Sequence, residues 1–376
     1  MRFVTPVLKH VVFPALSKSG YLRHSANAGP VVVTYHGVFP AGYKIRNSAL
    51  DGNLVHADSL RRQLQLLKKR YHLISPEDFR QWCVQVSPGG KYPAEQPSLP
   101  PHSILLTCDD ALRNTLTEMV PILQELGLTC LFFATGASAD ETPSMLWYEE
   151  LYLMLLEARG PVTLSLPDAN LFIGPIAPSD KHVGWWNLVE KLSPFDRESR
   201  RGFLDQICAK LKLPAGWQNR FIQNPNLAAR FLTLDAVGLR QLAAAGMTIG
   251  AHSLSHPILA RTSDELAWRE ISESRIILEK SLAQTVWAFG YPFGNPATVT
   301  RRDAQLAAQA GFDCAFMNAA GLLGARFNRF ALPRVHITAD MNLSEFEAHI
   351  SGFYHLLRRR LLGGDERNTT TDAPAS

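Results

Sequence analysis

The sequence predicts an α/β fold built from parallel strand–helix units and interrupted by a mainly helical insertion. Short apolar strands alternate with amphipathic helices before about residue 147 and again after about residue 234, and polar residues directly follow several of the strands. Between these two regions the alternation stops. Alternation of this kind is typical of a parallel sheet, because parallel strands are joined by crossover helices. A chain of 376 residues is long enough for one barrel with an insertion or for two domains.

The first region begins with the β-branched run at 31–34, which predicts a buried strand. Leu60, Leu64 and Leu67 lie at helical spacing and predict an amphipathic helix. The remaining elements expected here are a strand at 73–74, a helix from Pro76, a loop over 87–101, a strand at 104–107, a helix over 113–126 and a strand over 129–134.

The second region repeats the pattern after an insertion that we expect to cover about 147–234. Its predicted helices cover 234–245, 263–283 and 298–310, and its predicted strands cover 247–250, 286–289, 314–316 and 332–337. We therefore divide the chain into an N-terminal segment (1–29), an interrupted barrel (30–350), and a C-terminal part (351–376). The C-terminal part begins with the basic end of a helix and ends in a polar tail expected to be disordered.

Composition excludes several classes of protein. The formal net charge of +4 and the absence of a nucleic-acid-binding motif predict no nucleic-acid partner. The five cysteines are scattered and odd in number, which argues against a disulfide framework and against a zinc–thiolate site. No apolar run reaches the roughly 18 residues of a spanning helix. Residues 1–16 are interrupted by prolines and charges and lack a cleavage site, so we expect a cytoplasmic protein.

Two adjacent carboxylates, Asp109 and Asp110, follow the strand at 104–107. Ligands of α/β proteins bind at the carboxyl ends of strands, where successive side chains point in different directions and can take different tasks. The alternative is that Asp110 only caps the next helix.

Two histidines, His252 and His256, follow the strand at 247–250. Pro257 disfavours helical geometry at His256, so both histidines are expected on a turn where they can converge on one ion. Together with the aspartates they predict a site of two histidines and one aspartate for a divalent metal. A third motif, residues 290–294, predicts a tight turn whose backbone N–H groups can face a developing oxyanion.

These three motifs, in this order, resemble those of the polysaccharide deacetylase family, also called the NodB-homology domain or carbohydrate esterase family 4. Residues 107–111 (TCDDA) are similar to T-F-D-D-G, residues 252–256 match H-[ST]-x-x-H, and residues 291–294 (YPFG) are similar to Y-P-[FY]-G. The likeness covers roughly residues 30–345 outside the insertion.

The resemblance implies a distorted (β/α)7-type barrel with zinc, or else cobalt or nickel, on Asp110, His252 and His256. It also implies that Asp109 is the general base and that the turn Tyr291, Pro292 and Phe293 contacts the substrate and the oxyanion through the Phe293 N–H. The implied reaction is removal of an N-acetyl or other N-acyl group from a carbohydrate in cell-surface glycan biosynthesis. O-deacetylation, deformylation and non-catalytic glycan binding are the alternatives.

The sequence departs from the family pattern in ways that leave roles open. Ala111 replaces a glycine, so the backbone there must accommodate a Cβ. Gly290 stands where many members carry an arginine that orients the base, and Arg334 is the candidate to replace it, with an ordinary salt bridge as the alternative. The general acid is expected to be His36, which we prefer for its Tyr-His-Gly context, or else His336.

The C-terminal helix carries apolar residues and the run Arg358–Arg360. With the N-terminal segment it could lie on an anionic membrane, which would suit a lipid-linked glycan substrate. A helix that closes the barrel, with a solvated basic end, is the alternative that we favour. The oligomeric state is left open.

Overall fold

The computed structural model describes residues 4–24, 29–85, 99–166, 171–321, 323 and 327–362. Its main sheet is parallel, with the order β10-β1-β3-β4-β7-β8-β9, and β2 pairs with the beginning of β3. The strands are β1 (Val31–Tyr35), β2 (His72–Leu73), β3 (Ser103–Cys108), β4 (Leu131–Ala134), β7 (Thr248–Ala251), β8 (Ala288–Gly290), β9 (Cys314–Phe316) and β10 (Val335–His336).

The segment that leads into β10 joins the two edges of this sheet. Leu332 forms a parallel bridge with Phe316 of β9, and its N–H donates to the Ala315 carbonyl at 2.9 Å. Three residues later, Val335 pairs with Val33 of β1. The sheet therefore curls into a distorted barrel, which confirms the predicted fold class.

Helices surround the sheet, and the apolar face of each packs on it. They include α4 (Ala57–Arg70), α5 (Pro76–Gln85), α6 (Val120–Glu125), α12 (Ala236–Ala244), α13 (Asp264–Leu282) and α14 (Arg301–Gln309). The short helix α3 (Ser48–Asp51) instead packs Leu50 into the core of the insertion. The helix predicted over 113–126 is confirmed for residues 113–125; its middle, Thr115–Met119, is π-helical and leads directly into α6. Pro121 stands in the first turn of α6, where a missing N–H costs little.

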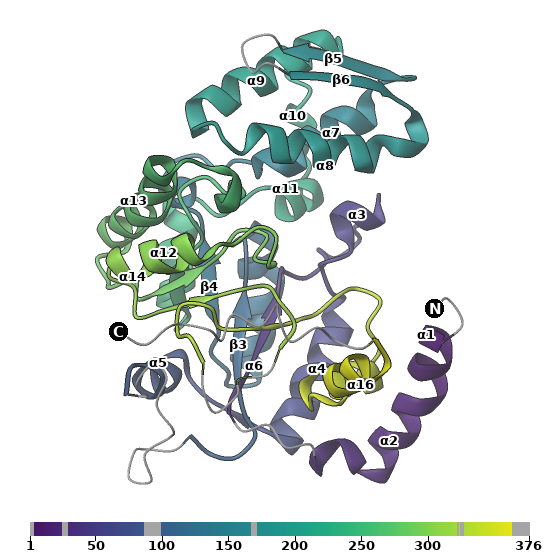
Figure 1. Cartoon of the computed structure of the whole chain (residues 1–376), viewed down its shortest axis with the longest axis vertical. Helices are drawn as coiled ribbons and strands as arrows, with labels where there is room; N and C mark the ends of the chain where they lie inside the picture. Colours follow the sequence, from purple (N-terminus) through teal and green to yellow (C-terminus); the bar gives the residue numbers. More distant parts are fainter. Residues whose placement is uncertain are drawn as a thin grey trace.

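The insertion forms a lobe at one end of the molecule (Figure 1), with a hydrophobic core of its own. Its elements are α7 (Trp147–Glu157), β5 (Val162–Leu166), β6 (Leu171–Ile176), α8 (Lys181–Leu192), α9 (Arg197–Lys210), α10 (Asn219–Gln223) and α11 (Pro225–Phe231). The lobe is mainly helical as predicted, but it also contains the antiparallel hairpin β5–β6. Val162, Leu164 and Leu166 are buried in alternation with exposed residues, the two-residue period of a strand.

The N-terminal segment is helical and packs beside the C-terminal helices (Figure 1). It contains α1 (Val4–Val7), the π-helical turn Leu8–Val12 and α2 (Phe13–Ser19), and the C-terminal helices are α15 (Leu343–Ile350) and α16 (Phe353–Leu362). Phe13 is buried with its ring edge-on to those of Phe353 and Tyr354. Residues 87–98 of the predicted loop and 363–376 of the predicted tail lie outside the described residues.

All five cysteines are free, and four of them are buried, as the sequence predicts. No helix in the described part of the chain is long and apolar enough to cross a membrane.

Candidate metal centre

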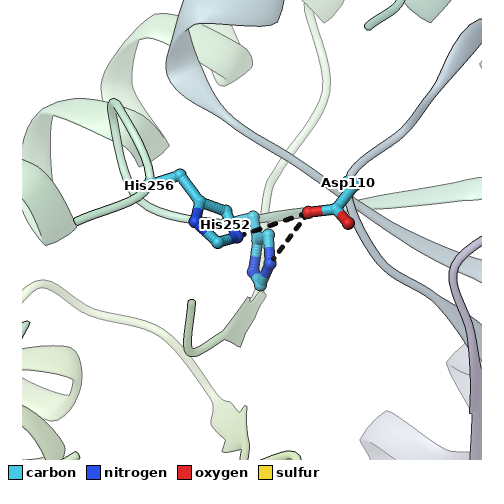
Figure 2. A group of neighbouring side chains, drawn as sticks. All are labelled: Asp110, His252 and His256. Atoms are coloured by element: carbon cyan, nitrogen blue, oxygen red, sulfur yellow. Dashed lines mark ion pairs between the residues drawn. The ribbon is translucent and has the colours of Figure 1, made fainter. Parts of the chain in front are cut away.

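The aspartate and histidine motifs meet at the carboxyl ends of neighbouring strands of the barrel. Asp110 follows β3, and His252 and His256 follow β7, with β4 lying between these strands. Figure 2 shows both imidazole rings turned toward the Asp110 carboxylate. Asp110 Oδ1 lies 3.6 Å from His252 Nε2 and 3.3 Å from His256 Nε2.

The chemistry of these three side chains fits a divalent ion. One ligand atom from each lies within 4.8 Å of the other two, and all three residues are buried. Asp110 Oδ1 is buried without a hydrogen-bond partner among the described residues, which is costly unless a cation satisfies it. Burial lowers the pKa of His252, and it lowers the pKa of His256 to about 4. Both imidazoles are therefore neutral near pH 7, as metal ligands must be.

Backbone contacts orient both histidines. His252 Nδ1 lies 2.6 Å from the Gly290 carbonyl oxygen, so Nδ1 carries the proton and the lone pair of Nε2 faces Asp110. The His256 backbone is held on two sides: its N–H donates to Ser253 Oγ at 2.9 Å, and its carbonyl accepts from the Trp147 indole at 2.8 Å.

Several residues of the motifs adopt positive φ angles, which side chains other than glycine rarely do. The angles are 70° at Asp110, 45° at Ala111, 60° at Ser253, 59° at His256 and 58° at Phe293. The backbone therefore does accommodate a Cβ at Ala111. Such angles cost about 1–3 kcal/mol each and are typical of functional sites.

Asp109 forms a two-pronged ion pair with Arg334. Arg334 Nη1 and Nη2 lie 2.6 Å from Asp109 Oδ1 and Oδ2 respectively, and both residues are buried. Burial opposes ionisation of Asp109, but Arg334 outweighs it and holds the pKa of this carboxyl well below its usual range. Arg334 also donates to the Met317 carbonyl at 2.9 Å.

A side chain at position 290 could not take the place of Arg334 without moving its neighbours. A Cβ on Gly290 would lie 2.8 Å from Cγ of Phe133 and 3.1 Å from Nδ1 of His252. The Phe133 ring occupies this space and lies under the Arg334 guanidinium, 5.3 Å from its central carbon.

Both histidines considered as general acid lie beside Asp109. The rings of His36 and His336 are 4.8 Å apart, and His36 Nε2 lies 3.7 Å from Asp109 Oδ2. Burial lowers the pKa of both histidines, that of His336 to about 4. Of the two, His36 lines the cavity over the metal ligands.

The residues of the third motif take different positions. The Phe293 ring lines the same cavity and packs edge-on against His256, with centroids 4.8 Å apart. Tyr291 is buried in the barrel core, and its hydroxyl donates to the Phe330 carbonyl at 2.9 Å. Pro292 is buried, and its carbonyl accepts from the Gly294 N–H. Tyr291 and Pro292 are not among the residues that line the cavity, and their side chains shape the turn; their contact with a substrate stays a prediction.

The cavity over the metal ligands has a volume of about 370 Å³ and includes residues that the sequence analysis missed. From the lobe come Tyr148, Glu149, His182, Trp185 and Trp186, from the α3 region Ala49, Leu50, Asn53 and Leu54, and from later loops Asn295 and Asn318. The adjacent aromatic pair Trp185–Trp186 was the available signal, but nothing in the sequence placed it near the aspartates.

Another missed residue, Arg200 of α9, holds the loop between His252 and His256. It is buried and donates to both the hydroxyl and the carbonyl of Ser255, and its guanidinium lies over the Trp147 ring. Glu270 of α13 accepts from the Ser255 N–H at 2.8 Å and lies 3.7 Å from Arg200. The lobe thus contacts the metal-binding loop directly.

Comparison with known families supports the class that the fold and this centre define. The sequence model of the polysaccharide deacetylase family matches residues 219–315, a range that includes the second and third motifs and excludes the aspartates. The match confirms the resemblance to this family over these residues.

Solved structures with the same fold include two deacetylases of low sequence identity. Streptococcus pyogenes deacetylase PplD, in complex with acetate, is 15% identical with a TM-score of 0.52, over 86% of this chain and 99% of that one. IcaB from Ammonifex degensii is 15% identical with a TM-score of 0.50, over 87% of this chain and 98% of that one. No curated protein matches the sequence. Because each structure is only 15% identical to this chain, the two similarities establish the fold alone.

Proposed function

We propose that this protein is a metal-dependent hydrolase that removes an N-acetyl or other N-acyl group from a carbohydrate. The observation that carries the proposal is the buried Asp110 Oδ1, which faces two imidazole Nε2 atoms and has no hydrogen-bond partner among the described residues. A second carboxylate, Asp109, lies beside it and is held ionised by Arg334.

Asp110, His252 and His256 would hold the ion, which we expect to be zinc, with cobalt and nickel as alternatives. When bound, a divalent ion polarises the acyl carbonyl and makes water a stronger acid. The predicted role of the Phe293 N–H is to donate to the carbonyl oxygen as negative charge develops there.

The remaining task is proton transfer. Asp109 takes a proton from the attacking water as its oxygen bonds to the acyl carbon. The carbon–nitrogen bond then breaks, and the leaving nitrogen takes up the proton that Asp109 removed from the water, passed on through His36, which lines the cavity with its Nε2 3.7 Å from Asp109 Oδ2. The products are a carboxylic acid and the free amine of the sugar. His336, 4.8 Å from His36 between ring centroids, is the alternative donor.

The proposal places the protein in the cytoplasm, acting on a glycan or a lipid-linked glycan intermediate of the cell surface. Peripheral membrane contact is supported by apolar side chains exposed on the packed terminal helices: Val7, Val11, Tyr21 and Leu356. Phe353, Tyr354 and Leu357 of α16 instead pack against the Phe13 cluster, as expected of a closing helix. Flotation with anionic vesicles tests the contact: Val11→Glu should reduce binding, and equal binding by both proteins would contradict it.

Metal-reconstituted protein and N-acetylated oligosaccharides test the hydrolase activity. We expect stoichiometric metal binding and release of acetate with one sugar amine per acetate. Asp109→Asn should bind the metal and lose turnover. O-acetylated and N-formylated sugars in parallel distinguish the two alternative activities. Deleting the gene and measuring which surface glycan gains acyl groups by mass spectrometry would identify the sugar.

A further inference from the structure

Half of the residues that line the cavity come from two segments outside the motifs: the α3 region and helices α7 and α8 of the lobe. The α3 region supplies one wall, with Ala49, Leu50, Asn53 and Leu54. The lobe supplies a second wall, made mostly of aromatic side chains. The shape of the cavity is therefore decided by segments that do not carry the metal ligands.

A buried arginine of α11 ties the two walls to each other. Arg230 Nε donates to Asp51 at 2.8 Å, and its Nη2 donates to the Leu50 carbonyl at 2.6 Å. On the other side Nη2 donates to Glu149 of α7 at 2.8 Å. Arg230 is fully buried, and removing one partner from such a buried ion pair is strongly destabilising. Figure 1 shows α3 beside α11, under the lobe. Arg230 therefore holds the α3 region and α7 at a fixed position relative to each other, and both segments contribute residues to the cavity.

The lobe wall presents an aromatic surface next to the metal ligands. Trp185 donates its indole N–H to the Tyr148 carbonyl at 2.7 Å and stacks on Tyr152. This fixes the helix that carries Trp186, whose half-buried ring packs edge-on against Phe293, 5.4 Å between centroids. A ligand with an apolar face gains by covering Trp186, and the carbon–hydrogen face of a pyranose ring is such a surface.

The cavity also offers a polar group that lacks a partner. Asn318 lines the cavity, and its Oδ1 is buried without a hydrogen bond to the described residues. A ligand hydroxyl or N–H would satisfy it. The volume of about 370 Å³ lies near the low end of the ~300–1,000 Å³ found for small-molecule sites, which suits one acylated sugar unit.

We propose that this cavity is a subsite for a single N-acylated pyranose unit that stacks on Trp186, which makes Trp186 a specificity-determining residue supplied by the lobe. The inference rests on the proposed function. Its physical basis is the half-buried Trp186 ring beside Phe293 and the unpartnered Asn318 Oδ1, in a cavity with room for one sugar unit.

Binding measurements on the full zinc-loaded chain test the subsite independently of turnover. The probes are N-acetylglucosamine, N-acetylgalactosamine and N-acetylmannosamine, with the β-1,4-linked dimer and pentamer of N-acetylglucosamine. We expect Trp186→Ala to weaken binding of the preferred monosaccharide at least about tenfold and Trp186→Phe to restore most of it. Trp268→Ala, on α13 and 39% exposed, is the matched control and should bind like the wild type.

The outcomes separate the subsite from the proposed reaction. Trp186-dependent binding without acetate release would support the subsite and contradict the hydrolase. Acetate release that Trp186→Ala leaves unchanged would overturn the subsite and leave the hydrolase standing. Binding of none of the three monosaccharides, or a pentamer bound more than tenfold tighter than the dimer, would also overturn a subsite that holds one sugar unit.

Discussion

Both carboxylate oxygens of Asp109 lie 2.6 Å from the guanidinium of Arg334, a residue 225 positions away in the sequence. Two parallel charge-assisted hydrogen bonds fix the plane of the carboxylate as well as its charge. Arg334 is in turn held by the Met317 carbonyl and by the Phe133 ring. The proposed base is therefore held in one orientation beside Asp110.

Replacing Arg334 should damage both stability and turnover. Arg334→Met leaves the Asp109 charge buried without its partner, which we expect to lower the unfolding free energy by about 3–5 kcal/mol. Arg334→Lys keeps the positive charge but loses the paired N–H groups that bond both oxygens of Asp109. It should therefore be more stable than Arg334→Met, with kcat still lowered at least about tenfold relative to the wild type. Denaturant unfolding and acetate release measure the two effects. If Arg334→Lys is as active as the wild type, the two-pronged geometry is unimportant.

Metal removal should destabilise the protein as well as inactivate it. Dialysis against a chelator leaves Asp110 Oδ1 without the cation that satisfies it. Because a ligand at 100 times its Kd adds about 2.7 kcal/mol, restoring zinc should raise the melting temperature. His256→Ala should lose this response, whereas His182→Ala, a histidine that lines the same cavity without belonging to the ligand group, should keep it. No zinc-dependent shift in the wild type would contradict the metal centre.

Arg200 should contribute to metal affinity although it is not a ligand. Its contacts with Ser255 hold the backbone next to His256. Residues that orient metal ligands typically contribute 10–100-fold to metal affinity, so we expect Arg200→Met to weaken zinc binding by that range in a competition assay. Arg201→Met is the matched control, since its partners Glu150 and Asp205 lie outside the ligand group. Equal zinc affinity in both variants would refute the role of Arg200.

The contact between α15 and α16 should make the fold sensitive to acid. His349 stacks on Tyr354, 4.0 Å between ring centroids, and burial lowers its pKa to about 4. Between pH 6.5 and 4 the unfolded chain binds more protons at this histidine than the folded chain does. Its contribution is therefore complete above about pH 6.5 and is lost as the pH falls, by at most about 3 kcal/mol.

Unfolding free energies measured from pH 7.5 to 4 check this expectation. His349→Gln should flatten the acid loss between pH 6.5 and 4, whereas replacement of the exposed His72 should leave it as in the wild type. An unchanged profile in His349→Gln would assign the acid sensitivity to other groups.

The sequence alone determined the features that depend on residues close together in the chain. The spacing of His252 and His256 and the adjacent aspartates after a buried strand predicted a metal centre, and the structure brings these ligands together. The alternation of strands and helices predicted the barrel because apolar periodicity reports directly which face each element buries. The β5–β6 hairpin was not predicted, because the prolines around it obscured the two-residue period of its apolar side chains.

Only the tertiary structure decided the features that depend on contacts between distant segments. The bidentate geometry of Arg334 on Asp109 arises because the last strand of the barrel closes on the first. The hydrogen bonds from Arg200 to Ser255 join residues 55 positions apart, and the bond from Arg230 to Leu50 of α3 joins residues 180 positions apart. No local pattern encodes such pairs, since each partner by itself has the character of an ordinary polar residue. The sequence therefore identified the candidate metal ligands, whereas the residues of the lobe that line the cavity over them became known only from the folded structure.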